Sequence, residues 1–202
     1  MQGIPLNERK RLGALLDDRP QTEVMAMIPQ FSQAETDNFV APPAQIPEAL
    51  GVLMFNMERG VNLPEIQEFL RDCPDIQPFD VILANELDDG CARSGNKNTA
   101  RELAQAFGLN YAWGLEFIEL VNDENAKGFH GNAVFSRWPI RRAGVIRLPE
   151  QYNWYFDRQK RIGGRLAVFA ELDVGGQPVG AVSIHLENRT HGEAVSYTHL
   201  TL

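Results

Sequence analysis

Short apolar runs that each end in a polar side chain are the feature of this sequence that most restricts its fold. The runs and their polar ends are Val52–Phe55 with Asn56, Val81–Ala84 with Asn85 and Glu86, and Ala181–Ile184 with His185. A continuous apolar run of this length is typical of a strand buried on both faces. Polar groups at the carboxyl ends of such strands lie where open α/β sheets place their ligands. The sequence therefore predicts a mixed α/β protein with a polar site at one end of its sheets.

Helical patterns separate the early runs, and turn signals separate the later ones. Leu63–Cys73 and Asn98–Phe107 have helical spacing of apolar residues, and Gly108 is the residue type favoured just past a helix end. Gly175-Gly176 is a hairpin signal. The predicted strands are Gly51–Asn56, Asp80–Asn85, Tyr111–Leu120, Asn132–Arg137, Ala143–Leu148, Leu166–Val174 and Val179–Leu186.

Residues 1–48 differ from the rest of the chain in their apolar pattern and proline content. Asn7–Asp17 is a short amphipathic pattern that predicts a helix with Asn7 as its cap, and Glu23–Ile28 predicts a second helical segment. Phe39–Pro47 contains three prolines, which interrupt regular structure. We therefore expect an N-terminal helical extension and proline-rich linker outside the core, followed by a domain over residues 49–194.

Charge and cysteine content exclude several classes of protein. The 202 residues carry a formal net charge of −8, which argues against a protein that holds duplex nucleic acid through an all-round basic field. The two cysteines, Cys73 and Cys91, are too few for a disulfide scaffold or a zinc cage. The N-terminus has no signal-peptide pattern, and no stretch approaches the length of a membrane span. These features predict a cytoplasmic protein without an obligate protein partner.

Asn, Glu and His at strand ends form a combination suited to a hard metal ion and a phosphate. Carboxylate oxygen is a ligand that Mg²⁺ prefers, while amide and imidazole groups can donate to phosphoryl oxygens. We expect Asn56, Glu86 and His185 to lie at one end of the sheets with Glu86 facing the cleft, the nearest side-chain atoms of each within roughly 10 Å of another member, the scale of a one-metal site with its substrate phosphate. Taken alone, each residue is better explained as a turn or cap residue, whereas three strands that end alike favour a shared site. For Glu58 and Arg59 we expect a surface ion pair, with substrate contact as the alternative.

Four segments, in order along the chain, resemble the endonuclease/exonuclease/phosphatase superfamily of metal-dependent phosphoesterases. They are LMFNMERG with Asn56 and Gly60, FDVILANELD with Glu86, GNAVFSRWPI over Gly131–Ile140, and GAVSIHLEN with His185. The resemblance covers about residues 49–194. It implies a DNase I-like fold of the α/β (α+β) class, in which two sheets form a sandwich flanked by helices.

The resemblance also implies roles for individual residues. Glu86 corresponds to the metal ligand for Mg²⁺ or Mn²⁺, and Asn56 to a residue that orients the metal shell or a phosphoryl oxygen. His185 corresponds to the histidine that hydrogen-bonds the scissile phosphate, and His130 to a further phosphate contact. The residues expected to line the cleft are Asn132 and Arg165, although Arg165 is equally explained as a solvated charge at the start of a strand.

The implied activity is hydrolysis of a phosphodiester or phosphomonoester, on a nucleic acid, a phospholipid headgroup or a small molecule. The family's second half supplies an Asp-x-Asn strand end and an Asp-His pair, whereas this sequence has no Asp after Asp173. We therefore expect an incomplete domain, truncated at the C-terminus and inactive by itself. Residues 195–202 are expected to be a non-native tail.

Other functions fit the sequence less well. A non-catalytic scaffold or binding domain with the same fold would have no use for three polar groups at buried strand ends. An unrelated α/β binding domain would require the four matches to arise by chance. His185 and Glu187 open a zinc-deaminase pattern, but its Pro-Cys-x-x-Cys pair is absent, and His185 with His191 has no third clustered ligand.

Overall fold

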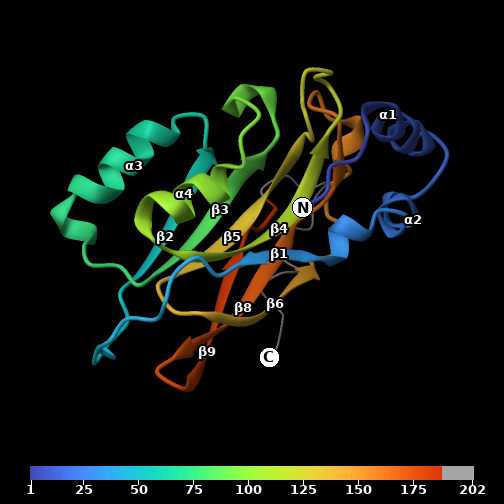
Figure 1. Ribbon diagram of the computed structural model, residues 1–202. Coiled ribbons are helices and arrows are strands. Elements are labelled where there is room, and N and C mark those ends of the chain that lie inside the picture. The colour runs from blue at the N-terminus through green and yellow to red at the C-terminus, as the bar shows by residue number, and fades with distance from the viewer. Residues whose placement is uncertain (188–202) are drawn as a thin grey trace.

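Two β-sheets packed face to face form the body of the protein in the computed structural model, which describes residues 1–187 (Figure 1). The large sheet contains, in spatial order, β1 (Ala34–Asp37), β4 (Asn110–Glu119), β5 (Phe129–Ser136), β3 (Val81–Asp89) and β2 (Val52–Arg59), and β7 (Arg161–Gly163) pairs with β4. The small sheet contains β6 (Ile140–Arg147), β8 (Leu166–Val174) and β9 (Gln177–Ile184). The strands β2 and β3 are parallel, and the other pairs are antiparallel. The expected two-sheet α/β sandwich is confirmed.

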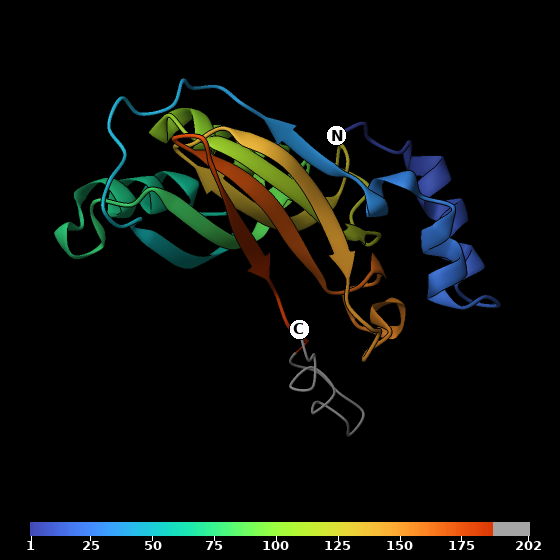
Figure 2. The same cartoon turned by 90° about the horizontal axis from the view of Figure 1, so that it is seen from below.

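Helices flank the sandwich at two places. The helices α3 (Leu63–Asp72) and α4 (Thr99–Phe107) cover the outer face of the large sheet, whereas α1 (Leu6–Leu15) and α2 (Gln21–Ala26) lie beyond one end of it (Figures 1 and 2). The side chain of Asn98 caps α4 by accepting a hydrogen bond from the Arg101 backbone N–H at 2.8 Å. Gly108 ends α4 in the left-handed conformation at φ +59°, as its position after the apolar pattern predicts.

The alternation of side chains along the large sheet produces two separate cores. One face, with Ile82 and Phe135, packs against α3 and α4. The opposite face, with Val81 and Val134, packs against Val168 and its neighbours in the small sheet. Because successive residues of a strand point to opposite faces, β4 and β5 contribute to both cores and are buried along their whole length.

The edge strand β2 differs from the strand that its sequence predicts. Val52 and Met54 were expected to be buried, but their side chains are 56% and 73% exposed. Val52 and Met54 pair in register with Val81 and Leu83, which face the small sheet. The small sheet ends at β9 and does not reach across β2, so the apolar run of β2 is covered on its helix-facing side alone.

The N-terminal segment is part of the core, which corrects the expectation that residues 1–48 lie outside it. The strand β1 extends the large sheet by pairing with β4. Leu12, Val24 and Phe31 are buried in the same hydrophobic cluster as the helix-facing side of that sheet. Arg9 is also buried, and its guanidinium donates to the carbonyl oxygens of Lys127 at 2.9 Å and Asn125 at 2.6 Å.

The predictions made from the sequence of this segment were partly wrong. The helix α1 begins at Leu6, with Pro5 before it and no side-chain cap, so Asn7 is not the capping residue. The strand β1, with the sequence AETD, is too short and too polar for its pattern to identify it. Residues 38–50 contain no helix or strand, in agreement with their proline content.

Truncating Phe31 tests whether the N-terminal segment stabilises the domain. Phe31 is 3% exposed, so Phe31→Ala is expected to lower the free energy of unfolding by about 3–5 kcal/mol in urea denaturation. Met27, four residues earlier, is 45% exposed, and Met27→Ala is expected to have a much smaller effect. If both variants lowered the free energy of unfolding by the same small amount, the segment would lie outside the core.

Candidate functional site

A β-bulge in the middle of β3 places Glu86. The register of β3 shifts against β5 between Ala84 and Leu87, and Glu86 has a left-handed backbone with φ +59°. The side-chain oxygen Oδ1 of Asn132 accepts a hydrogen bond from the Glu86 backbone N–H at 3.2 Å. Glu86 therefore does not follow the end of its strand, as the sequence suggested, but leaves the ladder at a bulge that Asn132 supports. Its carboxylate is 24% exposed.

The neighbouring strand β2 is irregular at the same level of the sheet. Its register against β3 shifts between Asn56 and Arg59, where Glu58 and Arg59 have φ values of +46° and +68°. Asn56 uses its Oδ1 to accept a hydrogen bond from the Glu58 backbone N–H at 2.9 Å. Non-glycine residues in the left-handed region cost on the order of 1–3 kcal/mol each and cluster at functional sites. Two adjacent strands thus carry strained backbone beside Glu86.

His185 lies next to Glu86, as expected, immediately after β9. Its Nε2 is 3.9 Å from Glu86 Oε1, and its Nδ1 is 2.9 Å from an Arg165 guanidinium nitrogen and 3.4 Å from Glu116 Oε2. Nδ1 thus lies between a donor, the Arg165 guanidinium, and an acceptor, the Glu116 carboxylate, while Nε2 faces Glu86. These contacts fix the orientation of the imidazole ring.

Glu116 is a residue of the candidate site that the sequence analysis does not identify. It lies in the fully buried strand β4, and its Oε1 accepts a hydrogen bond from Arg165 at 3.0 Å. Burial raises the pKa of the Glu116 carboxyl, but the neighbouring His185 and Arg165 outweigh burial, and the pKa is lowered from its ordinary value. A glutamate enclosed by apolar residues, in the middle of the segment NYAWGLEFIE, is the signal that could have identified it, because a buried charge requires partners.

A second chain of buried charges supports the site from behind. His130 Nδ1 lies 2.9 Å from Asp88 Oδ1, and its Nε2 lies 3.9 Å from Glu116 Oε2. Arg93 donates two hydrogen bonds to the Asp88 carboxylate, at 2.7 and 2.8 Å. Burial raises the pKa of Asp88, but the hydrogen bonds from Arg93 and His130 outweigh it and bring the pKa down to about 2. His130 is therefore fixed between two acidic side chains.

The structure brings some of the expected site residues together and separates others. Glu86, His130 and Arg165 line one cavity of about 160 Å³. Asn56 lines a different cavity of about 430 Å³, beside its register partner Asn85. Asn132 is fully buried behind Glu86, where its contact is with the Glu86 backbone.

Two expectations from the sequence need correction. The surface ion pair between Glu58 and Arg59 does not occur among the ion pairs of residues 1–187. Arg165 is not a solvated charge, because its side chain is 7% exposed and paired with Glu116 and Glu187. His191 and the expected tail over residues 195–202 lie outside the described residues.

The carboxylate of Glu86 is suited to one position in the shell of a hard cation. Within residues 1–187, no three His, Cys, Asp or Glu side chains gather as a metal-binding group. Mg²⁺ is commonly bound through one or two carboxylates with water in its other positions, so a single carboxylate fits this ion better than it fits zinc. The side-chain oxygen of Asn56 accepts from the Glu58 backbone N–H in its own strand, and Asn56 lines another cavity. Asn56 is therefore less suited than Glu86 to bind the same cation.

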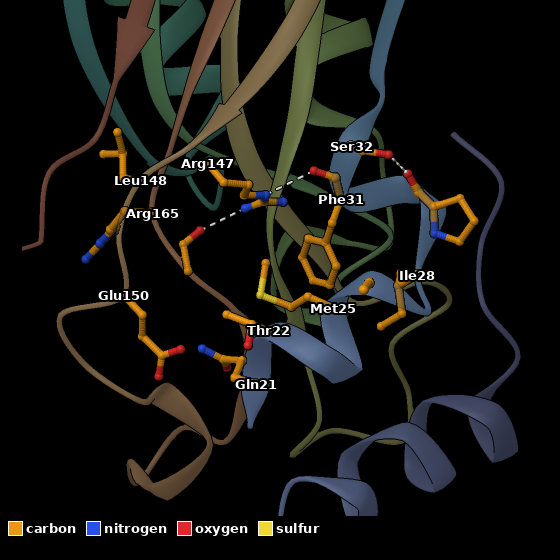
Figure 3. Close-up of a pocket in the computed structure, with 13 residues that line it drawn as sticks. Gln21, Thr22, Met25, Ile28, Phe31, Ser32, Arg147, Leu148, Glu150 and Arg165 are labelled. Carbon is orange, nitrogen blue, oxygen red and sulfur yellow. Dashed lines mark hydrogen bonds between the residues drawn. The ribbon is translucent and has the colours of Figure 1, made fainter. Parts of the chain in front are cut away.

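A larger and more apolar cavity lies between the N-terminal segment and the end of β6 (Figure 3). It has a volume of about 370 Å³, and Met25, Ile28 and Phe31 form its apolar wall. Arg147 reaches this region but uses its guanidinium to donate to the carbonyl oxygens of Phe31 at 3.0 Å and Gly164 at 2.9 Å. Apolar cavities often bind ligands, and Glu150 and Arg165 also line this one, but unlike the Glu86 cavity it has no histidine in its lining.

No protein-family model matches the sequence, and no curated protein matches it. Solved structures do show similarity. The chain is similar to proteins of the endonuclease/exonuclease/phosphatase family. One, an endonuclease/exonuclease/phosphatase from Beutenbergia cavernae DSM 12333, is 22% identical with a TM-score of 0.48, and the match covers 67% of this chain and 37% of that chain.

A family protein from Leptotrichia buccalis C-1013-b is 19% identical with a TM-score of 0.46, over 74% of this chain and 62% of that chain. A 3′ phosphatase from Neisseria, bound to a product DNA hairpin, is 20% identical with a TM-score of 0.39, over 69% of this chain and 42% of that chain. The chain thus spans less than two thirds of the length of each of these proteins. No helix within residues 1–187 has the length and apolar character needed to cross a membrane.

The Asp88 carboxylate provides a test of the buried network through pH. Its pKa is about 2 in the folded protein, below the value near 3.9 of an unfolded chain, so its contribution to stability is present above pH 4 and is lost as the pH falls toward 2. The contribution is about 2 kcal/mol. Asp88→Asn is therefore expected to lower the free energy of unfolding at pH 7, and the gap to the unmodified chain should narrow between pH 4 and pH 2.

The matched control for this measurement is Asp123→Asn. Asp123 forms an exposed ion pair with Lys10, and such pairs contribute little. Urea unfolding of the three proteins across pH 2–7 makes the comparison. A constant gap between the unmodified chain and Asp88→Asn at all pH values would show that the folded pKa of Asp88 is not depressed.

Proposed function

We propose that this chain carries the metal- and phosphate-binding part of the active site of a Mg²⁺-dependent phosphoesterase. The observation that supports the proposal best is the contact between Glu86 and His185, with His185 fixed by Arg165 and Glu116. The partly exposed Glu86 carboxylate lies in a cavity lined by arginines and has the oriented His185 imidazole beside it, an arrangement that suits a phosphate ester held through a hard cation. The resemblance of the sequence to the endonuclease/exonuclease/phosphatase superfamily points to the same chemistry.

Each residue has a role in this proposal that follows from its position. Glu86 would hold the cation, which supplies Lewis-acid polarisation of the phosphoryl oxygen when bound. His185 would donate from Nε2 to a non-bridging oxygen and so stabilise the charge that develops as water attacks phosphorus. The bond from phosphorus to the ester oxygen breaks, and the alcohol leaves with a proton. Arg165 and Glu116 hold the imidazole, while Asn132 holds the backbone of Glu86.

A non-catalytic scaffold is the alternative reading of the same fold. A scaffold that kept Glu116 and Asp88 would lose folding stability to their desolvation, because buried ionised side chains must each be matched by preserved partners. Strained backbone at Glu58, Arg59 and Glu86 would add to that cost without a benefit. These features favour the phosphoesterase over the scaffold.

Hydrolysis of bis(4-nitrophenyl) phosphate with Mg²⁺ or Mn²⁺ tests the proposal. The comparison is between the 202-residue chain, a protein in which the chain continues into the Asp-x-Asn and Asp-His motifs, and that longer protein with Glu86→Gln. We expect turnover in the unmodified longer protein alone, with a loss of at least about 10²-fold in Glu86→Gln. Mn²⁺ binding to the 202-residue chain, followed by electron paramagnetic resonance, should be weak and should disappear in Glu86→Gln.

Glu65→Gln is the control, because Glu65 is an exposed glutamate on α3 and lies outside the Glu86 cavity. It is expected to leave turnover and Mn²⁺ binding unchanged. Full activity in Glu86→Gln would overturn the proposal. Turnover by the 202-residue chain that Glu86→Gln abolishes would show that the further motifs are not required.

A further inference from the structure

Arg59 combines a strained backbone with a guanidinium that has no ion-pair partner among residues 1–187. It follows the bulge of β2 with φ +68°, a conformation that side chains other than glycine rarely adopt. Its Nε is buried and makes no hydrogen bond, and its guanidinium forms no ion pair with any side chain of residues 1–187. A half-buried charge without a partner is costly to a folded protein. This combination marks Arg59 as a residue kept for a ligand.

The arginines beside Arg59 are already matched by acids. Arg161 lies 2.9 Å from Glu119, and Arg165 contacts Glu116 at 3.0 Å and Glu187 at 3.2 Å. Arg59 adds a positive charge next to these pairs. Its effect is visible in the pKa of Arg161, which burial lowers most, which Glu119 raises, and which the charges of Arg93 and Arg59 lower further. Glu86 is the remaining acid of the Glu86 cavity, and no ion pair joins it to Arg59 among the described residues. A bound anion would therefore supply the ion-pair partner that Arg59 lacks.

Two cavities adjoin at Arg59. The side chains of Arg59 and Gln159 line both the Glu86 cavity, of about 160 Å³, and a second cavity of about 680 Å³. The second cavity is also lined by Tyr152, Phe156, Asp157 and Arg158. Its one acidic side chain, Asp157, already accepts hydrogen bonds from the Tyr152 hydroxyl at 2.8 Å and the Gln159 backbone N–H at 3.1 Å.

We propose that the second cavity is an anion subsite, in which Arg59 binds a further phosphate group of a substrate whose scissile phosphate lies beside Glu86 and His185. The position of this subsite relative to the scissile phosphate rests on the proposed function. The substrate class is then a phosphate ester that carries a second phosphate. The exposed ring of Phe156 also lines the second cavity, and it provides an apolar surface for the organic part of the substrate.

Anion binding without metal or turnover tests the subsite separately from hydrolysis. Isothermal titration of the metal-free 202-residue chain with inorganic pyrophosphate and with inorganic phosphate should show tighter binding of pyrophosphate. Arg59→Gln is expected to weaken pyrophosphate binding about tenfold, the size of one charge-assisted hydrogen bond, and to leave phosphate binding unchanged. Arg19→Gln, which removes an exposed arginine outside both cavities, is the control and should change neither affinity.

A glycine variant separates loss of binding from loss of fold. Arg59→Gly relieves the positive φ, so it should raise the midpoint of thermal unfolding while it weakens pyrophosphate binding as Arg59→Gln does. Unchanged pyrophosphate affinity in Arg59→Gln would overturn the proposal. An equal loss of phosphate and pyrophosphate affinity would also overturn it, because Arg59 would then belong to the scissile-phosphate site. Neither result depends on whether the longer protein hydrolyses phosphate esters.

Discussion

A carboxylate removed from water must be matched by neighbouring cations and hydrogen-bond donors, and Glu116 is fully buried in β4. Its surroundings are therefore not free to vary. Three side chains approach its two carboxylate oxygens: Arg165, which directly precedes β8, His185, which follows β9, and His130 of β5. The two sheets meet at this carboxylate, so the interaction that stabilises the buried charge also sets the orientation of the imidazole in the candidate site.

The second determinant of the site is the departure of two strands from regular pairing. A regular strand would alternate Glu86 with its neighbours on the two faces of the sheet. The bulge in β3 instead releases the Glu86 carboxylate, and the irregularity in β2 gives Arg59, which pairs again with Leu87, a left-handed backbone. Side chains from other strands support the first bulge, since Asn132 holds the Glu86 backbone and Ser183 donates to the Ala84 carbonyl at 2.9 Å. Bulges commonly re-aim side chains next to active sites.

The N-terminal segment contributes stability away from this chemistry. Its apolar residues extend the core beyond the helices α3 and α4, and buried Arg9 fixes α1 to the loop at Lys127 and Asn125. Lys127 in turn pairs with Asp89 at the end of β3. The segment is therefore connected to the strand that carries Glu86 and Asp88, although none of its residues lines the Glu86 cavity.

The sequence by itself determined most of the elements and four members of the candidate site. Continuous apolar runs identified the long strands and helical spacing identified both outer helices, because period and length are local properties that burial enforces. Glu86, His185, His130 and Arg165 could be named because they lie near the ends of apolar runs or match a family pattern. The tertiary structure alone decided which charges meet. Glu116, Asp88 and Arg59 acquire their significance from partners, or from the lack of one, on strands that the chain brings together over long sequence separations. A linear pattern records which residue types are present, but the match of a buried charge with its neighbours is a property of three-dimensional packing.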